Sequence, residues 1–365
     1  MSDWAPERLW HGGQPGAGLR VAVAGASHWH LPRHAQHLRE AGAGIVAVYD
    51  PEAAVAERWA HDLGCRAVRA LEEIADTVRP DLVLALGRVA DMAAQARLFL
   101  EAGLALMAEK PLGLDPDEVA AVASLAAARG GWVSVALVQR YDPLWGLLDR
   151  LRDGGRLGAI AHAHVRIING PPQRYAAWGS AWMLDPAVAG GGALLNLGIH
   201  GMDYFRHLAG DTDAVHVSGA ATTHRAHRQR IEDFGAATLR SGSGIVGTIE
   251  AGYTYPDAAA GMTRSGDNEI RIGASGAYLV ARDADVVLVT AAGEEALPGA
   301  RAGDRYRDWT FDSLARFRAG RPPAADASDC LAAVRLVFEA YRMAGADLSA
   351  QSARRSMEAG ASPAG

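Results

Sequence analysis

The chain has 365 residues, of which 49% are hydrophobic, so it is long enough for two domains with ordinary cores. Its 36 basic and 42 acidic residues give a net charge of -6 without a basic stripe, which argues against nucleic acid as a partner. Only Cys65 and Cys330 are present, which excludes a disulfide framework and a cysteine-based zinc site and suits a reducing compartment. No apolar run approaches the roughly 18 residues of a membrane helix. We therefore expect a cytoplasmic protein with no membrane partner.

The first part of the chain alternates between two patterns. Residues 1–18, rich in Gly, Pro and Trp, are expected to form a flexible leader and lack the apolar run of a signal peptide. Between residues 19 and 138, short apolar runs alternate with segments whose apolar residues recur every three or four positions. The runs are 19–25, 44–50, 81–87, 104–111 and 132–138. Buried strands that alternate with helices predict a doubly wound parallel sheet.

After Val138 the pattern changes. A helical segment at 143–154 leads to a strand at 159–168, in which His162, His164 and Arg166 alternate with apolar residues. More strands follow without intervening helices, at 214–220, 234–240, 244–253, 268–275, 277–282 and 285–290. This run predicts a large, mainly antiparallel sheet in an α+β domain over 139–346, closed by helices at 308–320 and 326–346. Residues 347–365 are expected to be a disordered tail.

The loop after the first strand partly matches a dinucleotide-binding fingerprint. The fingerprint is Gly-x-Gly-x-x-Gly, whereas this loop is Gly25-Ala-Ser27-His28-Trp29-His30 and keeps only the first glycine. Pro32 suits the first turn of the following helix, whose amino end attracts a pyrophosphate. We therefore expect a cofactor loop.

Asp50 ends the second predicted strand at about the spacing at which a carboxylate binds the cofactor's ribose. It accepts hydrogen bonds from a ribose diol and repels a 2′-phosphate, so NAD is favoured over NADP.

A metal site is the alternative for this segment. His30, His34 and His37 are spaced by four and three, so they can share a helical face. No Asp, Glu or Cys nearby in the sequence completes a ligand set. Solvated helix histidines are the commoner outcome, so no metal is predicted.

Two further motifs carry residues suited to catalysis. Glu109-Lys110-Pro111 leaves a buried strand toward the carboxyl edge of the sheet, where substrates bind in open α/β folds. Farther on, three glycines precede a predicted helix on which Asn196 and His200, four apart, share a face. The alternatives without a catalytic role are a surface turn with a solvated Lys110 and a His200 that is hydrogen-bonded within the core.

Together these motifs resemble the glucose–fructose oxidoreductase / inositol dehydrogenase (Gfo/Idh/MocA) family. The family marks are Glu-Lys-Pro and Gly-Gly-Gly-x-Leu-x-Asp-x-Gly-x-His-x-x-Asp. The second is present here, with one substitution, as Gly190, Gly191, Gly192, Leu194, Asn196, Gly198, His200 and Asp203. The resemblance covers about residues 19 to 346.

The resemblance implies a Rossmann domain, a second domain whose open sheet packs against a partner subunit, and a nicotinamide cofactor. It also implies oxidation or reduction of a carbinol on a sugar, cyclitol or related polyol by a homodimer or homotetramer. His200 suits the proton acceptor or donor, and Lys110 the group that stabilises the alkoxide. The expected cofactor-binding residues are Gly25, Ser27, His28, Trp29, His30, Asp50, Gly87, Arg88, Glu109 and Lys110. The expected substrate-binding residues are Lys110, Arg140, Tyr141, Trp178, Trp182, Asn196 and His200. The four that lie outside the two motifs, Arg140, Tyr141, Trp178 and Trp182, are equally suited to packing.

Three positions depart from the family pattern. Asn196 stands where the family usually has an aspartate, so the amide cannot raise the pKa of His200. Two loop glycines are replaced at Ser27 and His30. Gly87 and Arg88 stand where a Thr-Pro pair followed by a histidine often contacts the cofactor.

Two other functions remain open. One is an NAD-using glycosidase of the same family, which oxidises its substrate transiently and reduces it again. The other is a non-catalytic sugar- or nucleotide-sensing scaffold, which the altered loop favours and the intact motifs oppose. The cationic segment 223–230 suits either an acidic substrate or a solvated hairpin tip.

Overall fold

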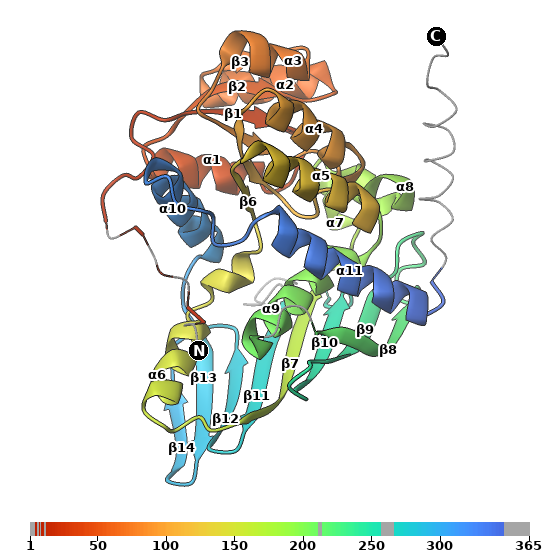
Figure 1. Ribbon diagram of the computed structural model, residues 1–365. Helices are drawn as coiled ribbons and strands as arrows, with labels where there is room; N and C mark the ends of the chain where they lie inside the picture. Colours follow the sequence, from red (N-terminus) through yellow and green to blue (C-terminus); the bar gives the residue numbers. More distant parts are fainter. Residues whose placement is uncertain are drawn as a thin grey trace.

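Two sheets dominate the computed structural model, which describes residues 4–5, 7, 9–10, 12–210, 214–256 and 266–346 (Figure 1). The first sheet is wholly parallel, with strand order β3-β2-β1-β4-β5-β6. Its strands are β1 (Arg20–Ala24), β2 (Gly44–Tyr49), β3 (Arg66–Ala67), β4 (Leu82–Ala85), β5 (Ala105–Ala108) and β6 (Val133–Val135). Strand order reverses between β1 and β4, and ligands bind at the carboxyl ends of strands at such a switch point.

Helices cover both faces of this sheet. They are α1 (Leu31–Glu40), α2 (Ala53–Leu63), α3 (Leu71–Glu73), α4 (Val89–Glu101) and α5 (Pro116–Arg129). The strands β4 and β5 are buried along their whole length, which explains their continuous apolar sequence. The predicted doubly wound parallel sheet is confirmed.

The second sheet has strand order β14-β13-β12-β11-β7-β10-β9-β8 and is antiparallel except where β7 pairs with β10. Its strands are β7 (Ile160–Asn169), β8 (His216–Thr223), β9 (Phe234–Arg240), β10 (Val246–Gly252), β11 (Gly266–Ala274), β12 (Ala277–Arg282), β13 (Asp285–Thr290) and β14 (Gly293–Leu297). The predicted mainly antiparallel sheet is thereby confirmed. The sequence pattern missed β14, whose residues are mostly exposed.

The helices of the second half lie on one side of this sheet (Figure 1). They are α6 (Leu144–Asp153), α7 (Arg174–Ala177), α8 (Pro186–Ala189), α9 (Ile199–Ala209), α10 (Arg305–Arg318) and α11 (Ala327–Met343). Helix α9 approaches β10 so closely that a Cβ on Gly201 would lie 2.6 Å from a methyl group of Ile249. A glycine is therefore required at this crossing.

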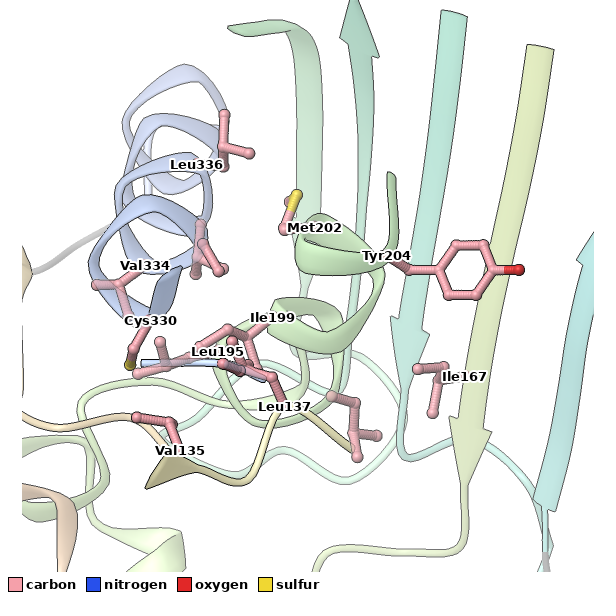
Figure 2. Packing of buried hydrophobic residues seen from close by; sticks show 14 of the residues in the cluster. Val135, Leu137, Ile167, Leu195, Ile199, Met202, Tyr204, Cys330, Val334 and Leu336 are labelled. Atoms are coloured by element: carbon pink, nitrogen blue, oxygen red, sulfur yellow. The ribbon is translucent and has the colours of Figure 1, made fainter. Parts of the chain in front are cut away.

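The last two helices pack back on the first half of the chain. Helix α10 contacts α1, and α11 contacts α5, α9 and β8. Figure 2 shows residues of α11 beside residues at or just before the start of α9 and at or just after the end of β6, namely Cys330, Val334, Leu195, Ile199, Val135 and Leu137. One continuous core therefore joins the two sheets.

The described residues before β1 also pack on the body. Trp4 is buried, its indole N–H donates to the Leu208 carbonyl oxygen at 3.2 Å, and its amide donates to Asp149. The Trp10 ring packs edge-on against Phe311 at 4.7 Å. These residues are anchored, where composition alone predicts a flexible leader. The predicted tail, 347–365, lies outside the described residues. Within the described part of the chain, no helix has the length and hydrophobicity to cross a membrane.

Candidate active site

A cleft of about 1080 Å³ opens at the carboxyl ends of the first sheet, beside the second sheet. Its volume is at the upper end of the range of small-molecule sites. The motif residues that line it are Ser27, His28, Trp29, His30, Lys110, Asn196 and His200. Residues farther along the chain complete it, among them Gln139, Asn169, Arg174, Tyr175, Trp178, Asn268, Arg305 and Tyr306.

The loop after β1 is held by backbone constraints and by Asp50. Gly25 has φ +100°, and a Cβ there would lie 2.5 Å from the Leu86 carbonyl carbon, so this one glycine is obligatory. The buried Asp50 carboxylate accepts the Ser27 N–H at 2.7 Å and the Glu52 N–H at 3.0 Å. Asp50 therefore shapes the loop from the end of β2.

The residues of this region fit a dinucleotide. Helix α1 has His30 at its N-cap position without a side-chain cap; the Leu31 N–H already donates to the His28 carbonyl oxygen and Pro32 has no N–H, so the Arg33 N–H is the amide of the first turn that an anion can accept from. The His30 ring, which replaces a glycine, points to Glu109, and the His28 ring stacks on Trp29 at 3.9 Å. The cleft continues past the loop to Glu52, Arg58 and Trp59, where a nucleoside would lie.

Glu109 is a buried carboxylate shared by two imidazoles. Its Oε1 lies 2.7 Å from His30 Nδ1 and 3.0 Å from His34 Nε2, and its Oε2 accepts the Lys110 N–H at 3.2 Å. Burial alone raises the pKa of Glu109, but the charge and hydrogen bonds of the histidines outweigh it and hold the pKa well below its usual value. The carboxylate is therefore ionised and accepts from both rings.

The geometry separates the three histidines that the sequence places on one helical face. His30 and His34 meet Glu109, whereas His37 lies 3.2 Å from Asp304. Potential ligand atoms of His28, His30 and Glu109 lie within 4.8 Å of one another. However, His28 Nδ1 accepts the His30 N–H, and the buried Nδ1 of His34 has no partner among the described residues. A metal-bound imidazole usually donates its second N–H to a neighbouring acceptor, and neither of these Nδ1 atoms does so. The arrangement therefore fits a carboxylate that accepts hydrogen bonds from histidines better than a metal site.

Lys110 is buried and donates to Asn196 through two hydrogen bonds. Its Nζ lies 2.6 Å from the Asn196 carbonyl oxygen and 2.9 Å from Oδ1. Burial lowers the pKa of Lys110 to about 8, although Glu109 opposes this shift. Lys110 is also the only lysine in the chain; the other 35 of its 36 lysine and arginine residues are arginines. A lysine can release its proton near neutral pH and an arginine cannot, so the residue type itself indicates a role in chemistry.

The Asn196 amide is fixed in one orientation. Its Nδ2 donates to the hydroxyl oxygens of Tyr175 at 2.8 Å and Tyr253 at 2.9 Å, which leaves Oδ1 for Lys110. Asn196 lies in a π-helical turn, Leu194–Gly198, that runs directly into α9. The two tyrosines thus aim the amide that holds the lysine.

The glycines before this turn admit a buried carboxylate. Glu232 accepts the N–H groups of Gly192 and Leu194 at 2.7 and 2.9 Å and the Tyr341 hydroxyl at 2.6 Å. A Cβ on Gly192 would lie in contact with the Glu232 backbone. The glycine run therefore lets Glu232 hold the start of the π-helical turn in place.

His200 lines the same cleft from α9. Its side chain is buried, and its Nδ1 has no hydrogen-bond partner among the described residues. Burial and the nearby Lys110 charge lower the pKa of His200 well below its usual value. Its imidazole is therefore neutral at pH 7, and no carboxylate among the described residues is hydrogen-bonded to it to fix its tautomer.

Comparison with known proteins identifies this arrangement. The family profile described as "Oxidoreductase family, NAD-binding Rossmann fold" matches residues 19–137, and "GFO/IDH/MocA C-terminal domain" matches residues 146–279. The chain belongs to the GFO/IDH/MocA family. The resemblance stated from the motifs is thereby confirmed.

Individual GFO/IDH/MocA relatives are distant. The chain is 31% identical over 183 residues to an inositol 2-dehydrogenase of Rhizobium meliloti (strain 1021), a match over 50% of this chain and 52% of that protein. It thus spans about half the length of this curated relative.

Solved structures share the fold over nearly the whole chain. The myo-inositol 2-dehydrogenase of Lactobacillus plantarum is 22% identical with TM-score 0.74, covering 90% of this chain and 97% of that chain. GenD2 from gentamicin A biosynthesis, solved in complex with NAD, is 21% identical with TM-score 0.76, covering 92% and 97%.

Two residues expected at the substrate lie elsewhere in this GFO/IDH/MocA chain. The Arg140 guanidinium pairs at 2.7 Å with both Asp203 and Asp329, and the Tyr141 hydroxyl donates to Asp312 at 2.8 Å. Neither side chain lines the cleft, because these acids, from α9, α11 and α10, bind them within the protein. Position next to the sixth strand suggested a substrate role; the structure corrects it to a role in packing.

The other predicted residues are nearer the cleft. Trp178 lines it with 52% of its surface exposed. Trp182 packs against the rings of His28 and Trp29. Gly87 lies beside the loop, since a Cβ on Gly25 would lie 2.6 Å from the Gly87 nitrogen. Arg88 pairs with Asp91 and lines a separate groove with Tyr49 and Leu71.

Sequence reasoning missed several aromatic and cationic residues around the cleft, among them Arg174, Tyr175, Tyr253 and Tyr306. Residues 244–256, which contain Tyr253, also look like the family's sequences, so a signal existed for it. Arg174 and Tyr175 begin α7, Tyr306 lies in the first turn of α10, and none of the three belongs to a motif.

Proposed function

We propose that this protein is an NAD-dependent oxidoreductase that transfers a hydride between a nicotinamide cofactor and a secondary hydroxyl or ketone of a sugar, cyclitol or sugar-derived substrate. The observation that carries the proposal is the meeting of Lys110, Asn196 and His200 with the loop 25–30 in one cleft. Names of relatives, among them inositol 2-dehydrogenases, agree with this chemistry.

The cofactor supplies the hydride acceptor or donor when it is bound. Gly25, the Arg33 N–H at the start of α1 and Asp50 would hold it. Asp50 favours NAD over NADP, because a buried carboxylate repels a 2′-phosphate.

The protein's own part is to bind the carbinol and handle its proton. The Lys110 ammonium has one N–H beyond those bonded to Asn196 and can donate it to the substrate oxygen, which stabilises alkoxide character. His200 presents a neutral imidazole at the same cleft, suited to exchange the hydroxyl proton. The amides of Gln139, Asn169 and Asn268 line the cleft and suit a polyol.

We also propose that the protein works as a cytoplasmic homodimer or homotetramer through the second sheet. In the described part of the chain, helices lie on one side of this sheet only. The other face carries a row of charged side chains, including Arg166 and Glu250, paired at 2.7 Å.

The test begins with titration of NAD(H) and NADP(H), followed by tryptophan fluorescence. A panel of cyclitols and sugars is then assayed for NADH formation with the wild-type protein and with Lys110→Ala and His200→Ala. Saturable NAD binding and turnover that Lys110→Ala loses would support the proposal, whereas an active Lys110→Ala/His200→Ala double variant would refute it. His200→Ala shows separately whether His200 itself exchanges the hydroxyl proton. Release of an aglycone without net NADH would instead support the glycosidase, and binding without turnover the sensing scaffold.

A further inference from the structure

The cleft contains a second imidazole that is better equipped for proton transfer than His200. His30 lines the cleft and has 21% of its side chain exposed, whereas its partners His34 and Glu109 are buried. Because Glu109 is ionised and can only accept, Nδ1 of His30 carries a proton and donates it at 2.7 Å. The neutral ring then has an unprotonated Nε2, and this atom has no hydrogen bond to any described residue.

A carboxylate behind an imidazole has two effects. It fixes the tautomer, and it stabilises the imidazolium that forms when the outer nitrogen takes a proton. The Glu109 carboxylate is itself held in place, since His34 and the Lys110 N–H donate to it. Edge-on packing against Tyr306, with ring centres 4.7 Å apart, further orients the His30 ring.

His200 lacks this arrangement. The residue one turn before it is Asn196, which is committed to Lys110 and the two tyrosines, and the buried Nδ1 of His200 has no partner among the residues described. All three side chains nevertheless line the same cleft, where the charges of Lys110 and His30 lower the pKa of His200 and the charge of Lys110 lowers the pKa of His30. The carboxylate–imidazole pair that is missing on α9 is therefore present across the cleft.

We propose that His30 is the catalytic acid–base of this enzyme, with Glu109 and His34 as its positioning residues. The inference rests on the proposed function. In the oxidation direction the hydroxyl O–H bond breaks and its proton bonds to His30 Nε2. The bound oxidised nicotinamide would supply the acceptor for the C–H hydrogen and its electron pair, so that the carbinol carbon would become a ketone. Reduction runs these steps backward, and Lys110 hydrogen-bonds the oxygen throughout.

Two departures from the family pattern thereby have one explanation. Asn196 leaves His200 without the carboxylate that the family usually places one turn before it. His30 replaces a loop glycine with an imidazole that is hydrogen-bonded to a carboxylate, that of Glu109. The exchange moves the acid–base group from α9 to the start of α1.

The decisive variant is His30→Gly, because it restores the residue of the dinucleotide fingerprint. It should keep NAD binding by tryptophan fluorescence but lower kcat by about 10²- to 10⁴-fold, the usual contribution of a general acid–base. Added imidazole should restore part of kcat, and the acidic limb of the kcat/KM profile should disappear. In the wild type that limb lies below the ordinary imidazole range, because burial lowers the pKa of His30 against the opposing effect of Glu109, with His34 and Lys110 also lowering it. The control is His61→Ala, which removes an exposed imidazole from α2.

A kcat in His30→Gly close to that of the wild type would overturn the proposal, and so would a loss that imidazole does not rescue. NMR of ¹⁵N-histidine provides a readout without substrate: the His30 signals, identified by their absence in His30→Gly, should show a protonated Nδ1 and a bare Nε2. The opposite tautomer, or a stoichiometric bound metal, would overturn it too. If the wild-type protein shows the expected tautomer but turns over no polyol, the proposed function fails while the His30–Glu109 pair stands.

Discussion

Replacing Asn196 by aspartate restores the family's usual residue and tests how Lys110 is controlled. The change is nearly isosteric and puts a negative charge where Oδ1 now lies, 2.9 Å from Lys110 Nζ. The Tyr175 and Tyr253 hydroxyls, which now accept from the amide, can turn and donate to the new carboxylate. Both charges are then satisfied in the same geometry.

Coulomb's law at an effective dielectric constant of about 20 gives an attraction of roughly 6 kcal/mol at this separation. Burial of the new carboxylate offsets part of it, and a close opposite charge typically shifts a pKa by about 1–3 units, or about 1.4–4 kcal/mol. The pKa of Lys110, lowered by burial to about 8 in the wild type, should therefore rise. An ammonium that is needed for activity is lost as the pH rises through this pKa, so the alkaline limb of the activity profile should move to higher pH.

The assay benefits from the sequence, because the protein has a single lysine. Protein labelled with ¹³C,¹⁵N-lysine gives one ε-carbon signal, whose shift against pH reports the pKa of Lys110 directly. Asn268→Asp is the matched control: it adds a carboxylate to the same cleft but has no hydrogen bond to Lys110. An unchanged or lowered pKa in Asn196→Asp would refute the assignment of Asn196 as the group that governs Lys110.

Three further results are expected. Gly25→Ala should weaken NAD binding and lower the free energy of unfolding by about 1–3 kcal/mol or more, because Gly25 has a positive φ and its new Cβ would lie 2.5 Å from Leu86. The control Gly64→Ala, which has a positive φ but open space around it, should lower the free energy of unfolding by only about 1 kcal/mol, as measured by urea unfolding. Asp50→Ala should raise the Kd for NAD more than that for NADP in fluorescence titration, and an unchanged ratio would contradict a role at the ribose. Arg140→Met should lower the free energy of unfolding by about 3–5 kcal/mol, since it leaves the buried Asp203 carboxylate without its main partner. A loss below about 1 kcal/mol would mean that these ion pairs are not structural.

The sequence by itself determined the architecture and the location of the site. The alternation of apolar runs with helical periodicity predicted the parallel sheet, and the run of strands from residue 159 onward predicted the second sheet. Both predictions were possible because the spacing of apolar residues depends on whether one or two faces of an element are buried. Glu109-Lys110-Pro111 and the motif around His200 could be placed at the cleft because both follow local rules: one ends a strand and the other starts a helix. The isolated lysine was equally visible in the sequence.

Only the tertiary structure decided which side chains meet. The His30–Glu109 contact joins residues 79 positions apart, and the Lys110–Asn196 contact joins residues 86 apart. Arg140 follows a strand as a substrate residue would, yet α9 and α11 bring Asp203 and Asp329 to it and bury it among them. Periodicity specifies which face of an element is buried, but the choice of partner depends on how helices from distant parts of the chain pack together. The tautomer and charge of each group in the cleft follow from that packing.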